Sequence, residues 1–308
     1  MKEILALTKR HIQCFFKDKG TFFTALITPA ILLLLYVTFL YDVYYESFAA
    51  SLQGIEYDEN LVEGLVGGLL ISSLLAVSTI TVSFCANLFM VQDKVTGARQ
   101  DLTIAPIKKH SLVISYYLAT VANGLLVSLV ACTGGCVYLA CTGWYLSFTD
   151  VLALFADVLL LVLFGTALSS VICYPLTTQG QLSAVGTVVS AGYGFICGAY
   201  MPLSSYGAGL RNVLSFFPGT YGTSLLRDHA LQGVYAKMTK RGIPAEAIES
   251  MRAVSDCDFE FFGHSVEIWQ MYLVLIVAVI LLVGGYILLN ALSSRKRKNK
   301  KTKGAGMR

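Results

Sequence analysis

Charged side chains are scarce in this chain. Asp, Glu, Lys and Arg make up 14% of its 308 residues, whereas hydrophobic residues make up 56% and the mean hydropathy is +0.66. Soluble domains have about 25% charged and about 45–50% apolar residues. A soluble fold of this length would lack polar side chains for its surface, so the composition predicts a polytopic membrane protein. The apolar runs are too long for barrel strands and do not alternate, which predicts an all-α fold.

Signatures of catalysis are also missing. The sequence has no GxxxxGK[ST] loop, no HExxH and no GxSxG, which argues against a P-loop ATPase, a zinc protease and a serine hydrolase. The eight cysteines include no CxxC pair and are typical of small packing residues, with Cys257 expected outside the membrane. The four histidines are scattered along the chain. We therefore predict a non-enzymatic chain that holds no metal and no other cofactor.

Six apolar stretches are long enough to cross a bilayer, which takes about 20 residues of helix. The second is rich in Ser, Thr and Gly, which favours close helix packing over a substrate path. The chain thus divides into a leader at 1–20, a six-helix domain at 21–292 and a tail at 293–308. The six predicted transmembrane helices are Thr21–Leu40, Leu65–Met90, Leu112–Leu139, Val151–Cys173, Leu182–Met201 and Ile268–Leu292.

Basic residues collect on one side of this topology. The leader, the 91–109 loop and the tail are rich in Lys and Arg, whereas the Tyr41–Glu63 loop has six acidic residues and no basic one. Short loops rich in Lys and Arg stay in the cytoplasm. With an even number of spans, both termini are therefore predicted to be cytoplasmic.

The leader has an amphipathic pattern from Lys2 to Lys19. Its apolar residues recur at spacings of three and four, and its basic residues fall elsewhere, as in helices that lie in the membrane interface. A solvated leader is the alternative. The expected apolar face is Ile4, Leu5, Ile12, Phe15 and Phe16.

The region 202–267 between the last two predicted spans is unusual. Pro218 and Gly219 separate two short apolar segments, Tyr206–Phe217 and Tyr221–Leu231. Segments of 10–14 residues cannot span a bilayer and suit re-entrant helices. Lys237–Phe262 is expected to be an exposed insertion, with a helix at 245–254 after a proline.

Asp157 lies inside the fourth predicted span, about two turns from Asp150. An ionisable residue at membrane depth is a candidate pathway residue. If it is one, the chain could instead be an ion-driven carrier or an intramembrane enzyme centred on Asp157. A position near the interface, where water reaches the carboxylate, is the structural alternative.

The 91–109 loop is the main polar segment between two apolar runs. Its charged residues offer charge-assisted hydrogen bonds to a partner protein, and its proline disfavours helix just before the third span. An ordinary solvated loop with positive-inside charge is the alternative. The candidate partner-binding residues are Asp93, Lys94, Gly97, Arg99, Asp101 and Pro106.

Three blocks in this order resemble the type-2 class of ABC transporter permeases. The first is the leader LTKRHIQCFFKDKGTFF. The second is the loop pattern Asp93, Gly97, Leu102, Pro106. The third precedes the last span and contains Gly194, Phe195, Gly198, Pro202, Leu203, Leu210, Pro218 and Tyr221.

The resemblance implies a bacterial cytoplasmic membrane protein that pairs with a second permease, identical or paralogous, and with two ABC ATPase subunits. ATP and Mg would be bound by those subunits, and no nucleic acid would be involved. The 91–109 loop would be a coupling helix in an ATPase cleft. Val95 stands where many members have a second acidic residue. The re-entrant pair would form an outer gate from Phe195, Phe216, Phe217, Pro218 and Tyr221.

The expected function is export of an amphipathic compound, such as a drug, an antimicrobial peptide or a lipid-like molecule. Export of a lipid-linked polysaccharide or teichoic acid by the same fold is the alternative. The leader and the loop resemble drug-type members more closely, which favours the first hypothesis.

Overall fold

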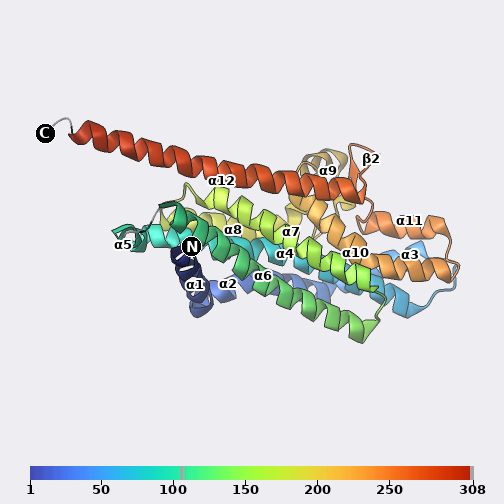
Figure 1. Cartoon of the computed structure of the whole chain (residues 1–308). Helices are drawn as coiled ribbons and strands as arrows, with labels where there is room; N and C mark the ends of the chain where they lie inside the picture. Colours follow the sequence, from blue (N-terminus) through green and yellow to red (C-terminus); the bar gives the residue numbers. More distant parts are fainter. Residues whose placement is uncertain (105–106, 108, 306–308) are drawn as a thin grey trace.

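The computed structural model describes residues 1–104, 107 and 109–305. Long helices pack side by side into an elongated bundle (Figure 1). Their order is α1 (Lys2–Lys17), α2 (Lys19–Leu35), the π-helix η1 (Tyr36–Leu40), α3 (Tyr41–Ser51), α4 (Glu59–Val95), α5 (Ala98–Ile104), α6 (Lys109–Thr142), α7 (Phe148–Cys173), α8 (Gln179–Ile196), the 3-10 turn η2 (Leu203–Ser205), α9 (Ala208–Leu214), α10 (Pro218–Lys240), α11 (Ala245–Val254), the hairpin β1 (Glu260–Phe261) and β2 (His264–Ser265), and α12 (Ile268–Ala305).

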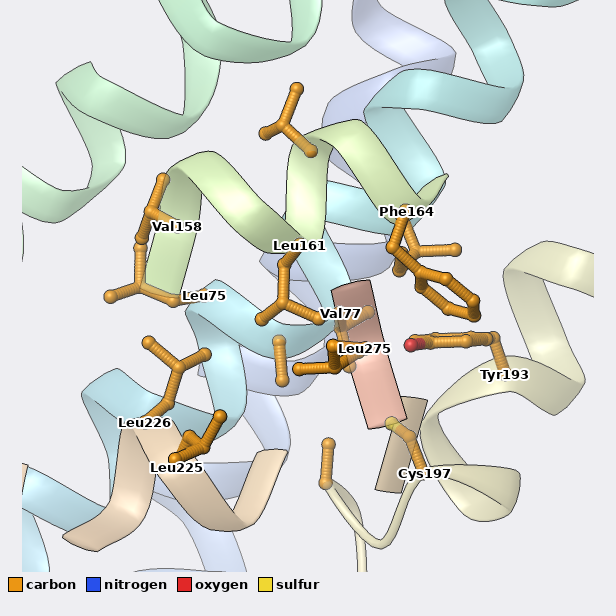
Figure 2. Packing of buried hydrophobic residues seen from close by; sticks show 14 of the residues in the cluster. Leu75, Val77, Val158, Leu161, Phe164, Tyr193, Cys197, Leu225, Leu226 and Leu275 are labelled. Carbon is orange, nitrogen blue, oxygen red and sulfur yellow. The ribbon is translucent and has the colours of Figure 1, made fainter. Parts of the chain in front are cut away.

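Helix α4 is the centre of the bundle. In its most apolar stretch 94% of the residues are buried, against 11% for α12, which lies along the outside (Figure 1). A helix that is apolar on all sides is covered by other helices or by lipid, and the small and hydroxylic residues of α4 suit contact with helices. Figure 2 shows Leu75 and Val77 of α4 packed among side chains of α7, α8, α10 and α12.

Small residues let the neighbouring helices approach α4 closely, as the sequence predicts. A Cβ added to Gly68 would lie 2.6 Å from the Leu231 side chain, and one added to Gly165 would lie 2.8 Å from Ile80. The hydroxyl groups of Thr79 and Ser83 donate to carbonyl groups of α4 itself, so they are satisfied without a substrate.

Within the described residues, five helical segments are long and apolar enough to cross a membrane. They agree with the first, second, third, fourth and sixth predicted spans, but several are longer. The first continues through η1 and α3, so much of the predicted Tyr41–Glu63 loop is helical. The fifth predicted span, Leu182–Met201, coincides with α8, which ends at Ile196 and is too polar to belong to this set. The five segments are Lys19–Ser51, Glu59–Val95, His110–Thr142, Phe148–Cys173 and Ile268–Leu292.

The region 202–267 differs from the prediction in two ways. Pro218 and Gly219, which were expected to separate two short segments, form the first turn of α10, and α10 runs for 23 residues to Lys240 instead of ending near Leu231. The predicted exposed insertion is exposed only in part, because Met238, Met251 and Cys257 are buried. The predicted helix after Pro244 is confirmed as α11.

Helix α1 packs on α6 through a stripe that shares Phe15 with the predicted apolar face. Its buried residues are Leu7, His11 and Phe15, spaced four apart. Of the expected apolar face, Leu5 is 74% and Phe16 40% exposed. The N-terminus, α5 and the C-terminal end of α12 lie at one end of the bundle, and α3 and α11 lie at the other (Figure 1).

Candidate functional site

A groove of about 1000 Å³ separates the first long helix from α8. One wall is formed by α2, η1 and α3, and the other by α8 with the segment that follows it. Most lining residues are apolar, and the polar ones are chiefly hydroxyl groups. The first wall includes Thr28, Ile31, Leu35, Phe39, Val43 and Ser47, and the second includes Ser190, Ala191, Phe195, Tyr200, Met201 and Pro202.

The second wall is shaped by a tight turn at the end of α8. The backbone N–H groups of Ala199 and Tyr200 donate to the Gly194 carbonyl at 2.8 and 3.1 Å. Gly198 has a φ of +76°, which favours glycine. The Tyr200 ring lies so close to Gly194 that an added Cβ would be 2.4 Å from it. Phe195 contacts the same ring edge-on at 5.0 Å.

A buried ion pair joins this turn to α10. Arg227 of α10 is 1% exposed and donates to Asp256 at 3.0 Å and to the Gly198 carbonyl at 2.6 Å. Asp256 accepts from the backbone N–H groups of Leu203 and Ser204. A buried charge is tolerated when it is paired and hydrogen-bonded. The pair therefore fixes the groove wall to α10.

Asp157 forms a second buried polar cluster that does not line the groove. Its carboxylate lies 2.6 Å from His229 Nδ1 on α10 and accepts from the Tyr272 hydroxyl of α12 at 2.5 Å. It is 1% exposed, so interfacial water does not solvate it. The cluster joins three helices, and within the described residues no three potential ligands are grouped to hold a metal.

Asp93 is not part of a loop but of the last turns of α4. It is 4% exposed and accepts from the Tyr116 hydroxyl at 2.6 Å and from Arg10 at 3.2 Å. Burial alone would lower the pKa of the Arg10 guanidinium, but the hydrogen bond to Asp93 raises it above its ordinary value. Asp93 thus joins α1 and α6 to α4.

His11 extends this cluster and is held neutral. Its ring stacks on the Tyr116 ring at 4.1 Å, and Arg10 lies 3.2 Å from Nδ1. Burial, and next the charge of Arg10, lower the pKa of His11 to about 4. The neutral ring with an acceptor at Nδ1 carries its proton on Nε2, which is buried and has no hydrogen-bond partner among the residues that the structure describes.

Lys94 also points into the protein. Its ammonium donates to the carbonyl groups of Tyr174 and Leu176 at 2.6 and 3.1 Å, and Cys173 is at 3.4 Å. Carbonyl groups at a helix C-terminus lack intrahelical partners and attract cations. Lys94 therefore caps α7.

Two of the remaining predicted loop residues, Arg99 and Asp101, belong to the short helix α5. Gly97 has a φ of +83° and turns the chain from α4 into α5. Asp101 is exposed and Arg99 is half-buried, and Ile104 is 84% exposed. Pro106 lies outside the described residues. α5 extends the bundle at the end where the N-terminus lies (Figure 1).

Residues 2–230 match the family described as ABC-2 type transporter. This segment is well over half of the chain. The chain belongs to the ABC-2 type transporter family. The predicted permease class is thereby confirmed, and this ABC-2 chain is a transport permease subunit that is not itself catalytic. No curated protein matches it.

The predicted gate residues of this ABC-2 chain lie in different surroundings. Phe216 is 66% exposed and contacts Phe261 and Phe262. Phe217 contacts Phe164 and Tyr193. Tyr221 contacts Phe259 at 4.6 Å. Pro218 is the first residue of α10, and Phe195 lines the groove.

Sequence reasoning missed Arg227, Asp256 and His229 in this ABC-2 chain. All three lie in the region that was expected to be re-entrant or exposed. A charged residue that is exposed to water needs no protein partner. A signal was present, because Arg227 and His229 lie inside the apolar segment Tyr221–Leu231. Ionisable side chains in such a segment require partners when the segment is buried.

Proposed function

We propose that this chain is the membrane-spanning subunit of an ATP-driven exporter that moves an amphipathic compound across the bacterial cytoplasmic membrane. The observation that carries the proposal is the groove between α2–η1–α3 and α8. Ligand pockets have volumes of about 300–1000 Å³ and are mostly apolar with a few polar groups. An apolar lining favours an amphipathic compound over a polysaccharide, whose hydroxyl groups would lose hydrogen bonds there.

The proposed topology has six crossings, with α8 as the fifth. The C-terminus of α7 contacts Lys94 near α5, whereas the first turns of α12 reach Asp157 near the start of α7. The chain must therefore return between α7 and α12, and α8 is the long helix available for that return. Its 18 residues would cross about 27 Å at 1.5 Å per residue.

The end of the bundle that carries the termini and α5 would face the cytoplasm, because the basic leader and tail lie there. α1 would lie in the interface and present Leu5 and Phe16 to lipid. α9 and the first turns of α10 would form the re-entrant pair, and Phe216, Phe217, Pro218 and Tyr221 would gate the outer exit.

The ATPase partner would bind at α5. Arg99 and Asp101 are the polar residues we assign to that contact, with Ile104 as an apolar anchor. Asp93, Lys94 and Gly97 would act indirectly, because they hold α5 at the end of α4. ATP and Mg would be bound by the partner, and a second permease copy or paralogue would complete the transporter.

The test is transport by the chain reconstituted with its ATPase in liposomes. Ala191→Trp fills the groove from α8, and Ala184→Trp is the matched control, because Ala184 is an exposed residue of the same helix that does not line the groove. We expect Ala191→Trp to reduce transport at least tenfold and the control to retain it. Equal transport by both variants would refute the groove as the pathway.

The carrier hypothesis centred on Asp157 has less support. Both carboxylate oxygens are engaged by His229 and Tyr272, and Asp157 does not line the groove. Transport that persists when the partner's ATP hydrolysis is abolished would overturn the exporter proposal and favour the carrier.

A further inference from the structure

A second pocket, of about 510 Å³, lies at the end of the bundle opposite α5. It is formed by the turn between α6 and α7 and by the C-terminal half of α10. Its lining is mixed and is more polar than that of the groove. The residues that matter for its chemistry are Trp144, Ser147, Thr149, Gln232, Lys237 and Lys240.

The floor of the pocket is formed by close backbone packing at Gly233. A Cβ added to Gly233 would lie 2.1 Å from the Tyr145 carbonyl oxygen, so α10 meets the turn between α6 and α7 backbone to backbone. The Tyr145 ring is also packed 2.9 Å from the Cβ position of Gly64. Trp144, the preceding residue, is directed outward and is 48% exposed. The pocket therefore has a rigid floor and an aromatic edge.

The lysines give the pocket a positive charge. Lys237 and Lys240 lie one turn apart on the face of α10 that begins at Gly233, and both are exposed. Neither forms an ion pair with any residue that the structure describes. The adjacent Arg241, in contrast, is paired with Asp58 at 2.6 Å.

The carboxylate in the pocket does not cancel this charge. Asp150 accepts from the backbone N–H of Ser147 at 2.8 Å and closes the capping box of α7. A carboxylate in the first turn is balanced by the positive end of the helix. The hydroxyl groups of Ser147 and Thr149 are hydrogen-bonded to each other at 2.7 Å, which leaves one hydroxyl proton of this pair free. Two lysines, that hydroxyl group and the Gln232 amide are then available to an anionic oxygen ligand.

We infer that this pocket binds the phosphate of an anionic phospholipid headgroup, such as that of phosphatidylglycerol. The pocket lies where the apolar parts of α6 and α7 end, and an exposed tryptophan is typical of the headgroup level of a bilayer. Lysine side chains with apolar stems reach headgroup phosphates from such positions. The hydroxyl and amide groups suit the glycerol oxygens. This site is separate from the groove and does not depend on the ATPase partner.

The test uses the full chain in lipid nanodiscs and measures the fluorescence of a tryptophan at the pocket. Trp144 and Trp269 are the two tryptophans of the sequence, and Trp269 is 63% exposed. Trp269→Phe therefore leaves Trp144 as a local reporter. Brominated phosphatidylglycerol and brominated phosphatidylcholine quench tryptophan on contact, so the ratio of their quenching measures lipid preference at the pocket.

We expect the Trp269→Phe chain to prefer brominated phosphatidylglycerol by roughly tenfold or more, since each lysine near an anionic surface contributes about fivefold. The double variant Lys237→Gln, Lys240→Gln should abolish the preference for phosphatidylglycerol. The double variant Lys237→Arg, Lys240→Arg keeps the positive charge and should therefore retain the preference. Lys9→Gln with Lys17→Gln removes the same charge from the other end and should have no effect on Trp144.

Equal quenching by the two lipids in the Trp269→Phe chain would overturn the inference, as would a preference that survives Lys237→Gln with Lys240→Gln. Inorganic phosphate in detergent is the second probe. If millimolar phosphate changes Trp144 fluorescence while brominated phosphatidylglycerol is not preferred, the pocket binds a soluble phosphate and the lipid assignment is wrong.

Discussion

Replacing Asp93 tests whether this residue holds the bundle together or contacts a partner. Asp93→Ala removes the acceptor for two side chains, the Tyr116 hydroxyl at 2.6 Å and Arg10 at 3.2 Å. The first bond is buried and charge-assisted, so its loss costs about 1.5–3 kcal/mol, including the orphaned hydroxyl. The Arg10 side chain is 37% exposed, which limits its bond to about 1 kcal/mol or less. We expect a loss of about 3 kcal/mol in the free energy of unfolding.

The assay is a double-mutant cycle with Tyr116→Phe, followed by SDS-induced unfolding from detergent micelles. Because the two residues share one bond, the double variant should be less destabilised than the sum of the single variants by about 2 kcal/mol. Asp101→Ala is the matched control, since Asp101 is an exposed carboxylate in the neighbouring helix, and it should change stability by less than about 0.5 kcal/mol.

Additive effects in the cycle would refute this reasoning, because they would mean that the bond contributes nothing. The partner contact is separated by a pull-down of the ATPase. Arg99→Ala with Asp101→Ala should lose the ATPase while retaining the unfolding midpoint. Loss of the ATPase from Asp93→Ala alone, with unchanged stability, would return Asp93 to the partner surface.

Two further outcomes follow from the buried ionisable residues. The pKa of His11 is about 4 in the folded chain and near 6.5 when unfolded, so the unfolded state binds the extra proton between these values. The stability that comes from the neutral His11 is complete above pH 6.5 and is lost as the pH falls towards 4, by up to about 3 kcal/mol. His11→Phe should keep the ring stack and reduce the fall in melting temperature over this pH range. An unchanged fall in melting temperature would contradict the low pKa of His11. Asp157→Asn should leave ATP-driven transport within about twofold, because the amide can still bond Tyr272 and His229, whereas Asp157→Leu should destabilise the chain by about 3 kcal/mol by orphaning both. Abolished transport in a stable Asp157→Asn chain would favour the carrier hypothesis.

The helical class and five of the spans could be predicted from the sequence because long apolar runs admit few other structures. The ends of helices were less predictable. Leucine-rich stretches stop at a polar residue, but a helix continues for as long as its neighbours support it. Thus α4 extends past Met90 to Val95, and the first helix extends to Ser51.

The candidate coupling residues show why a polar residue in sequence is not a surface residue in space. Asp93 and Lys94 directly follow an apolar run, and their charges suggested a solvated loop. Their partners are far away in the sequence, 83 residues for Arg10 and 80 for Tyr174. No local pattern encodes such pairs. Arg227 and Asp256 were missed for the same reason.

The distribution of these ties indicates which part of the fold moves most easily. Among the described residues, the ion pairs join α1 to α4, α7 to α10, the end of α10 to the start of α4, and α10 to the segments around α11, whereas none involves α2 or α8. A buried charged pair cannot slide without losing its partner, but apolar contacts can shift at small cost. The Tyr36 hydroxyl bond to the Val66 carbonyl is a polar tie between the first helix and α4. The helices α2 and α8 on the two sides of the groove therefore lack ion pairs among the described residues, whereas the Tyr36 bond holds the first helix to α4 and Arg227 holds the turn after α8 to α10. We expect any opening of the groove to occur between the helical parts of α2 and α8.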